Sequence, residues 1–359
     1  MEIAGKSLEK DDIMIFNLND CNRIKKRICA VAVLSIFALS LSSCTQNEIA
    51  PEYVIDNSNK LVVYTSHKEV IYKPIIKEFE ERTGIWVEIR SGGTNEVLEL
   101  IAKENGENSC DVMFGGGVDS LCAYEEYFEP YITAVDVHLD KTYASKSNSY
   151  TVFSKLPTVF VYNTKLVLPS GAPRTWKQLL EYTWKNNIAF ADPEKSGSSY
   201  TALSMMVQQL EKDGIVQADA IREFSDNLGG ELSKGSDTVV DDVAEGKKMI
   251  GITLEENVLK KKATGADIEM IYPDGTCAVP DGAAIVKGCT HRENAEKFME
   301  FIVGDDVQHL LEDQLFRRSV RTDFESFNLP GETEYDLEYA MKKRREILTI
   351  WEQTYEEII

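Results

Sequence analysis

The chain lacks the short motifs that mark the common enzyme and metal-site classes. Its four histidines stand in no HExxH pattern, and its seven cysteines form no CxxC pair. No GxGxxG, P-loop or nucleophile-elbow sequence occurs, and no fixed-period repeat is visible. These absences give no basis for naming a catalytic residue, a metal ligand or a cofactor. We therefore expect a protein that is not an enzyme; turnover of a substrate at the cell surface would contradict this.

Positive charge is scarce. The chain has 39 Lys and Arg against 60 Asp and Glu, a formal charge of −21. Such a surface repels nucleic acid and anionic lipid, so no nucleic-acid partner is expected. The net charge does not exclude a small anionic ligand, because a local site can be positive in an acidic protein.

Long apolar runs are also lacking, apart from one near the start. Residues 28–41 form a run of about 14, short of the roughly 20 needed to span a membrane but suited to a signal peptide. A basic cluster at 23–27 precedes it, and small residues lead to Cys44. This order predicts a lipoprotein signal over residues 1–43, with lipid on Cys44 holding the protein to the outer face of a bacterial membrane. A signal anchor or short membrane helix is the alternative, and translation starting at Met14 would explain the polar first residues.

The polar residues 44–60 are expected to form a tether between the lipid and the folded part. Four further cysteines follow it, Cys110, Cys122, Cys277 and Cys289, and an exported location permits disulfides. Cys277 and Cys289 flank a predicted strand and would lie too far apart to bond. A Cys110–Cys122 bridge stays open, with free thiols as the simpler expectation.

An alternation of strand and helix follows the tether. Strands are predicted at 61–65, 86–90 and 111–114, and helices at 71–83 and 95–105, where apolar residues repeat at helical spacing. This order indicates a parallel, doubly wound α/β sheet. Ligands of such sheets bind beyond the carboxyl ends of the strands, here residues 66–67, 91–94 and 115–117.

A second series begins near residue 157. Strands are predicted at 158–162, 187–191 and 249–253, helices at 175–182, 199–210 and 221–228, and a returning strand at 279–286. We therefore expect two lobes, 61–156 with 280–359 and 157–279, joined by two crossovers near 157 and 279. Two crossovers make a hinge, with the binding site in the cleft between the lobes.

Two turns suit an anion. Ser196, Gly197, Ser198 and Thr201 follow a strand and open a helix, where free N–H groups and the helix dipole favour negative charge. In the other lobe Ser91, Gly92, Gly93 and Thr94 are placed in the same way. Ordinary N-capping and a tight turn would give the same patterns.

Further candidates stand at other strand ends. Ser66 and His67 follow the first strand, and Gly116 leaves backbone open to a ligand, although a surface loop and a sharp turn explain them equally. Glu255 follows the strand 249–253 and could accept hydrogen bonds from ligand hydroxyls or an amine; a solvated carboxylate at a helix start is the other interpretation.

The order of these segments resembles the extracellular solute-binding proteins of ABC importers, most closely the ferric-iron, hexose-phosphate and 2-aminoethylphosphonate group. The resemblance rests on VVYTSHKEVIYKPIIKEFEERTGIWVEI, SGGTNEVLELI, CDVMFGGG, ADPEKSGSSYTAL, YPDGTCAVPDGAAIVKG and RRSVRTD, from about residue 60 to 323. It implies a two-lobed type II periplasmic-binding fold, a monomer that closes on its solute and works with a permease and an ATPase.

The resemblance also bears on the solute. Iron-binding members use a tandem tyrosine pair, and no Tyr-Tyr occurs here. Phosphate-recognising members use Ser/Thr/Gly turns, which favours a small phosphorylated or phosphonate solute. A ferric-iron receptor using Tyr72, Tyr162 or Tyr272, and a lobe pair that signals to a membrane histidine kinase, remain the alternatives.

Overall fold

The computed structural model describes residues 59–104, 110–324, 329, 332–333 and 335–358. The predicted signal peptide, Cys44 and the tether up to residue 58 lie outside this range. Within the described part, none of the helices combines the length and apolar character that a membrane span requires.

The strands form a mixed sheet in the order β2-β1-β3-β9-β5-β7-β6, with β10 and β8 on β5 and β4 on β9. They are β1 (Lys60–Thr65), β2 (Trp86–Ser91), β3 (Val112–Gly117), β4 (Phe128–Glu129), β5 (Thr151–Asn163), β6 (Ile188–Ala189), β7 (Ile250–Leu254), β8 (Ile268–Ile271), β9 (Ala278–Val286) and β10 (Arg318–Ser319). Strand β1 pairs in parallel with β2 and with β3, which confirms the predicted β-α-β-α-β unit.

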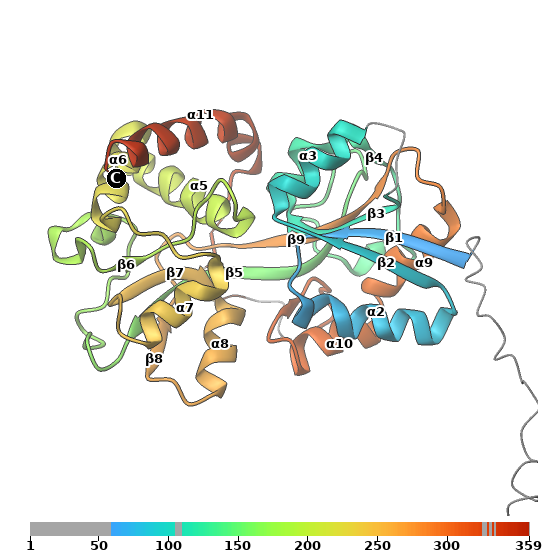
Figure 1. The fold of residues 1–359 in the computed structure, drawn as a ribbon, viewed down its shortest axis with the longest axis horizontal. Coiled ribbons are helices and arrows are strands. Elements are labelled where there is room, and N and C mark those ends of the chain that lie inside the picture. Colours follow the sequence, from blue (N-terminus) through green and yellow to red (C-terminus); the bar gives the residue numbers. More distant parts are fainter. Residues whose placement is uncertain (1–58, 105–109, 325–328, 330–331, 334, 359) are drawn as a thin grey trace, which may run out of the picture. The chain divides into compact units, whose positions relative to one another are not determined.

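Strand β5 joins the two lobes. Its residues 151–157 pair with β9, whereas its residues 158–163 pair with β7 and β8. The partners change at Pro157, which has no N–H to donate to a ladder. Figure 1 shows β5 and β9 running between the elements around β1–β3 and those around β6–β8. The predicted two-lobed α/β architecture with two crossovers is therefore confirmed.

The helices cover both groups of strands. They are α2 (Glu69–Thr83), α3 (Thr94–Glu104), α4 (Val118–Ala123), α5 (Gly197–Lys212), α6 (Gln217–Leu228), α7 (Ser236–Ala244), α8 (Glu255–Ala263), α9 (Arg292–Ile302), α10 (Asp305–Asp313) and α11 (Leu337–Glu356). Helix α2 is capped by Gly84, whose φ of 68° is the left-handed conformation that glycine adopts readily after a helix. The predicted apolar stripes of α2 and α3 are buried.

The helix predicted at 175–182 is wrong. The chain forms two 3₁₀ turns there, Lys177–Leu180 and Tyr182–Trp184, separated by Glu181 with an extended ψ of 140°. The side-chain amide of Asn227 donates to the carbonyls of Leu179 and Glu181 at 2.9 and 3.2 Å. Asn227, on helix α6, thus holds the carbonyls on either side of the break between the two turns.

The C-terminal helix departs from the expected division, which placed all of 280–359 in the first lobe. Helix α11 packs mainly on α6 of the second lobe, and it also contacts α5 of that lobe and α4 of the first (Figure 1). Trp351, 1% exposed, meets the rings of Phe190 and Phe224 at 5.9 and 6.4 Å. We propose that α11 belongs with 157–279, because its apolar stripe completes the core of that lobe.

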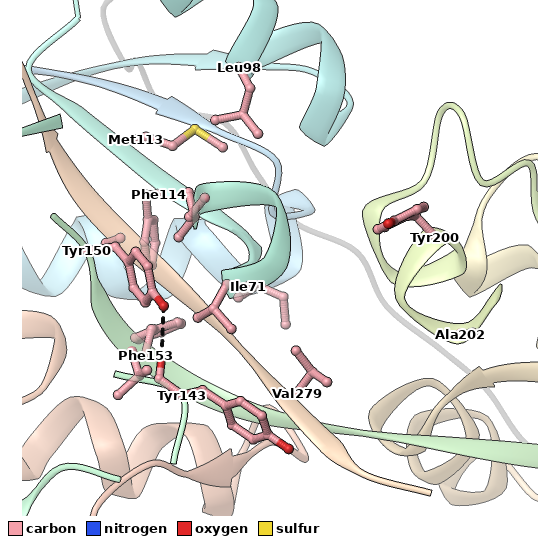
Figure 2. Packing of buried hydrophobic residues seen from close by; sticks show 14 of the residues in the cluster. Ile71, Leu98, Met113, Phe114, Tyr143, Tyr150, Phe153, Tyr200, Ala202 and Val279 are labelled. Atoms are coloured by element: carbon pink, nitrogen blue, oxygen red, sulfur yellow. Dashed lines mark hydrogen bonds between the residues drawn. The ribbon is translucent and has the colours of Figure 1, made fainter. Parts of the chain in front are cut away.

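An aromatic core lies beneath the carboxyl ends of β1 and β3. The Phe114 ring packs edge-on against Phe153 at 4.9 Å and against Phe298 at 5.3 Å. Figure 2 shows Phe114, Phe153 and Tyr150 in this core, and Tyr150 donates to the backbone carbonyl of Tyr143 at 3.0 Å. The four cysteines of the described part are free thiols, so Cys110 and Cys122 are not bridged.

Candidate functional site

A cleft of about 1120 Å³ lies between the two lobes. The first lobe lines it with the residues that follow β1, with the ends of β2 and β3 and with helices α2 and α3, and the second lobe lines it with α5, α7 and α8. Of the residues predicted from the sequence, those that line it are Ser66, His67, Ser91, Gly92, Gly93, Thr94, Gly116, Ser196, Gly197, Ser198 and Thr201. Glu255 is not among the lining residues.

Five helices begin at this cleft. The first-turn residues Glu69 of α2, Thr94 of α3, Gly197 of α5, Ser236 of α7 and Glu256 of α8 all line it. The first N–H groups of a helix have no partner within the helix and carry the positive end of its dipole, so such a cleft favours negative charge. Sequence reasoning identified the α3 and α5 turns and missed the α7 turn, which follows no recognisable strand.

The α5 turn differs from the other four. Its first turn contains no Asp or Glu, whereas α2, α3, α7 and α8 each carry an acidic residue there. Ser196 caps the helix by accepting from the Ser199 N–H at 3.3 Å. Among the residues that the structure describes, none accepts from the N–H groups of Gly197 and Ser198, so these groups remain for a ligand.

The two predicted turns meet across the cleft. A Cβ on Gly197 would lie 2.8 Å from Thr94 Oγ1, and one on Gly93 would lie 3.1 Å from the Lys195 carbonyl oxygen. Asn95 donates its side-chain amide to the Glu194 carbonyl at 2.5 Å. Glycine is therefore required at 197 for the turns to approach this closely.

Thr201 is already engaged. Its hydroxyl lies 2.8 Å from Asp119 Oδ2 and 3.1 Å from the Gly197 carbonyl, both of which can only accept. Since a hydroxyl has one proton, Thr201 joins the lobes through Asp119 and has no proton left for an anion.

The glycines after β3 shape the wall of the cleft. Gly115 and Gly116 have φ of 108° and 87°, a region that L side chains rarely adopt. A Cβ on Gly115 would lie 2.8 Å from Ser66 Oγ, and one on Gly116 would lie 2.9 Å from Thr94 Cγ2. Backbone rather than side chain thus faces the α3 turn.

The base of the cleft holds a buried ionic group. Arg317, 7% exposed, donates to Asp281 Oδ2 at 2.6 Å, to Ser154 Oγ at 3.1 Å and to Glu256 Oε2. Although burial opposes its charge, Glu256 and Asp281 together raise the pKa of Arg317. Burial raises the pKa of Asp281, against the influence of Arg317 and Ser154. Since Asp281 lies in β9 and Glu256 in α8, Arg317 ties the lobes together.

His67 faces this group. Its Nε2 is buried without a hydrogen-bond partner among the described residues and lies 3.5 Å from Asp281 Oδ2. Burial first, then the charges of Arg317 and Lys260, hold the pKa of His67 well below its usual value. His67 is therefore neutral at physiological pH and can offer one donor or one acceptor to a ligand.

Glu255, which the sequence suggested as an acceptor for ligand hydroxyls or an amine, does not line the cleft. Its carboxylate accepts from Arg318 at 2.7 and 2.9 Å and from the Tyr272 hydroxyl. Burial and the bond to Glu255 raise the pKa of Tyr272 to about 12. Glu256, the next residue, lines the cleft instead. The sequence pointed to Glu255 rather than Glu256, because one residue of rotation at a helix start decides which side chain points inward.

Charge in the cleft is nearly balanced, unlike that of the whole chain. The basic lining residues are Lys68, Lys103, Lys195, Lys234, Lys260 and Arg317, and the acidic ones are Glu69, Glu96, Glu99, Glu194, Asp237, Glu256 and Asp281. Of the three tyrosines considered for iron, only Tyr72 is among the lining residues. The cleft of the described chain is thus less negative than the formal charge of −21 implies.

Comparison with known proteins agrees with this geometry. Residues 109–332 match the model of a family described as bacterial extracellular solute-binding protein. The chain is 25% identical over 290 residues to iron uptake protein A1 of a Synechocystis species, covering 76% of this chain and 79% of that protein. It is 22% identical over 308 residues to a putative 2-aminoethylphosphonate-binding periplasmic protein of Salmonella typhimurium, covering 83% and 86% of the two chains.

A solved structure shares the fold. The periplasmic binding protein AfuA from Actinobacillus pleuropneumoniae, with exogenous fructose-6-phosphate bound, superposes with a TM-score of 0.73 at 22% identity, covering 83% of this chain and 98% of that one. The predicted type II periplasmic-binding fold is therefore confirmed. With more than half of its length matched by the family model, the chain belongs to the bacterial extracellular solute-binding proteins, which act outside the cytoplasm and deliver solutes to ABC importers.

Proposed function

We propose that this receptor captures a small anionic organic solute, with a phosphate or phosphonate group as the charged part. The observation that carries the proposal is the contact between the α3 and α5 turns, with the free N–H groups of Gly197 and Ser198 at a helix start that has no acidic residue. The relative described as a putative 2-aminoethylphosphonate-binding protein and the similar structure with fructose-6-phosphate bound support the same class.

The hydrogen-bond donors of the α3 and α5 turns account for the expected binding energy. The N–H groups of Gly197 and Ser198 and the hydroxyl of Ser198 can point at one anion from the second lobe, and the first N–H groups of α3 can do so from the other. A hydrogen bond to a charged group contributes roughly 1.5–3 kcal/mol. Four such bonds together contribute about 6–12 kcal/mol, a range that includes the roughly 8 kcal/mol to which micromolar affinity corresponds.

The remainder of the solute would lie over the base of the cleft. Arg317 is already paired with two carboxylates, so it is not the main anchor of the anion. His67 Nε2 and Glu256 offer one neutral and one charged polar group to hydroxyl or amino groups of the solute. This arrangement fits a polar organic anion better than an inorganic ion.

We also propose that the mature protein begins at Cys44 and is held to the membrane by lipid on its thiol. The support is the sequence alone, a basic cluster, a short apolar run and small residues before the cysteine. More than one acyl chain is needed for stable anchoring. A Cys44→Ala variant is expected to leave the membrane fraction, and its retention there would contradict the lipid anchor.

Titration calorimetry tests the solute class. The panel is 2-aminoethylphosphonate, fructose 6-phosphate, methyl phosphate and inorganic phosphate. Ser198→Ala is expected to weaken binding of the best member about tenfold, because one charge-assisted hydrogen bond is lost. Ser170→Ala, at an exposed site in the same lobe, is the matched control. Folded protein that binds none of the panel would contradict the proposal.

A further inference from the structure

The α3 turn carries an anion of its own. Glu96, in the first turn of α3, folds back so that its Oε2 accepts from the Gly93 N–H at 3.2 Å. A Cβ on Gly92 would lie 3.0 Å from the same oxygen, so the carboxylate lies directly over the turn. Glu96 is exposed and lines the cleft.

This contact changes what the turn can offer a solute. The Gly92 N–H donates to the Thr65 carbonyl at 3.1 Å, and the Gly93 N–H is taken by Glu96. An incoming anion can reach the Gly93 N–H only by displacing the carboxylate. The α5 turn contains no such competitor, since its first turn has no acidic residue.

The position of Glu96 also brings its charge close to the anion held by α5. Gly93 lies against the Lys195 carbonyl and Thr94 against Gly197, so the two turns share one edge of the cleft. A negative charge at this edge repels a bound anion, and the repulsion grows with the charge of that anion.

We propose that Glu96 determines charge selectivity in this cleft by competing with the solute for the α3 turn. The inference rests on the proposed function, that of binding an organic anion. Glu96 lowers the affinity for every anion, and it lowers the affinity for a dianion more than that for a monoanion. The receptor therefore prefers a solute whose anionic group carries one charge, or whose second charge is neutralised within the molecule.

A purely structural role for Glu96 predicts a different outcome. Glutamate at this position of a helix is half of a capping box, and its loss would destabilise α3. Glutamine also accepts a hydrogen bond in a capping box, so Glu96→Gln keeps the cap and removes only the charge. A structural role therefore predicts unchanged or weaker binding in this variant, whereas competition predicts tighter binding.

The experiment compares methyl phosphate, a dianion above neutral pH, with dimethyl phosphate, a monoanion, by calorimetry on the whole mature protein. Glu96→Gln is expected to tighten dimethyl phosphate binding about threefold and methyl phosphate binding about tenfold, since the Coulomb energy scales with the charge. Glu99→Gln removes the same charge from α3 without uncovering Gly93. Glu99→Gln is expected to change the anion affinity less, and this change should vanish near 1 M salt, where the screening length is about 3 Å. The change caused by Glu96→Gln should persist at that salt concentration.

Equal affinities of Glu96→Gln and wild type, or an unchanged ratio between the two probes, would overturn the inference while the proposed function stood. An effect of Glu99→Gln that matched Glu96→Gln at high salt would also overturn it. If no anion of either panel bound wild type or Glu96→Gln, the inference and the proposed function would both fail.

Discussion

Replacing Arg317 with methionine tests how the base of the cleft is held together. Arg317 donates to Glu256 of α8 and to Asp281 of β9, and all three residues are at most 7% exposed. Methionine fills much of the same volume but leaves two buried carboxylates without their cation. The free energy of unfolding should therefore fall mainly for electrostatic reasons.

The size of the loss follows from the remaining partners. Removing one partner of a buried ion pair costs about 3–5 kcal/mol. Asp281 still accepts hydrogen bonds from the hydroxyl and N–H of Ser154 at 2.7 and 3.0 Å, and Glu256 still pairs with Lys260 at 3.7 Å. These remaining partners favour the lower end of that energy range. A loss of about 3 kcal/mol lowers Tm by roughly 6–12 °C for a protein of this size, at 2–4 °C per kcal/mol.

Scanning calorimetry at neutral and mildly acidic pH measures this effect. Burial already raises the pKa of Asp281, and loss of Arg317 raises it further, so the Asp281 carboxylate takes up a proton as the pH falls. The deficit of Arg317→Met should thus shrink in acid, because a raised folded-state pKa destabilises only above the unfolded-state value of about 3.9. Arg317→Lys, which keeps the charge, should recover part of the loss. A Tm within about 2 °C of wild type at neutral pH would refute this account of the cleft base.

Three further outcomes are expected. Gly197→Ala should weaken anion binding about tenfold, because the new Cβ would lie 2.8 Å from Thr94 Oγ1 and keep the turns apart; unchanged affinity in calorimetry would contradict the contact. His67→Gln should reduce the fall in the free energy of unfolding below about pH 6.5. The pKa of His67 is lowered in the folded protein, so the unfolded chain takes up a proton that the folded chain does not, an effect of about 1.4 kcal/mol per pH unit. Parallel pH profiles of wild type and variant in urea unfolding would count against it. Trp351→Ala should cost about 3–5 kcal/mol in thermal unfolding, while Tyr182→Ala, at a residue 84% exposed, should stay within about 0.5; similar effects of the two would refute the placement of α11.

Local sequence patterns were sufficient for the first lobe. The strands β1 and β2 and the helices α2 and α3 carry short-range signals, such as a β-rich run, an apolar stripe and Gly84 as a stop. The parallel order of β1, β2 and β3 follows from that alternation, because a strand-helix-strand unit can close in essentially one way. The α5 turn was predictable for the same reason, because serine and glycine between a predicted strand and a predicted helix indicate a turn that opens the helix.

Features that depend on distant residues were not predictable. Arg317 meets Glu256 across 61 positions and Asp281 across 36, and no spacing rule connects them. The 3₁₀ turns at 177–184 are held by Asn227, which lies 48 and 46 residues from its partners Leu179 and Glu181. Helix α11 buries Ala340, Ile347 and Trp351, but its local sequence does not show which lobe that face covers. Glu96 was noticed only as part of a helix, because its fold-back onto Gly93 is a matter of rotamer rather than of pattern.

The most direct measurement is a crystal structure of the protein with its co-purified or best-binding anionic solute. The account predicts one oxygen of the anion within about 3 Å of the N–H groups of Gly197 and Ser198, with the α3 turn closing on the other side. A solute held elsewhere in the cleft, with no contact between its anionic group and residues 196–199, would contradict the central claim.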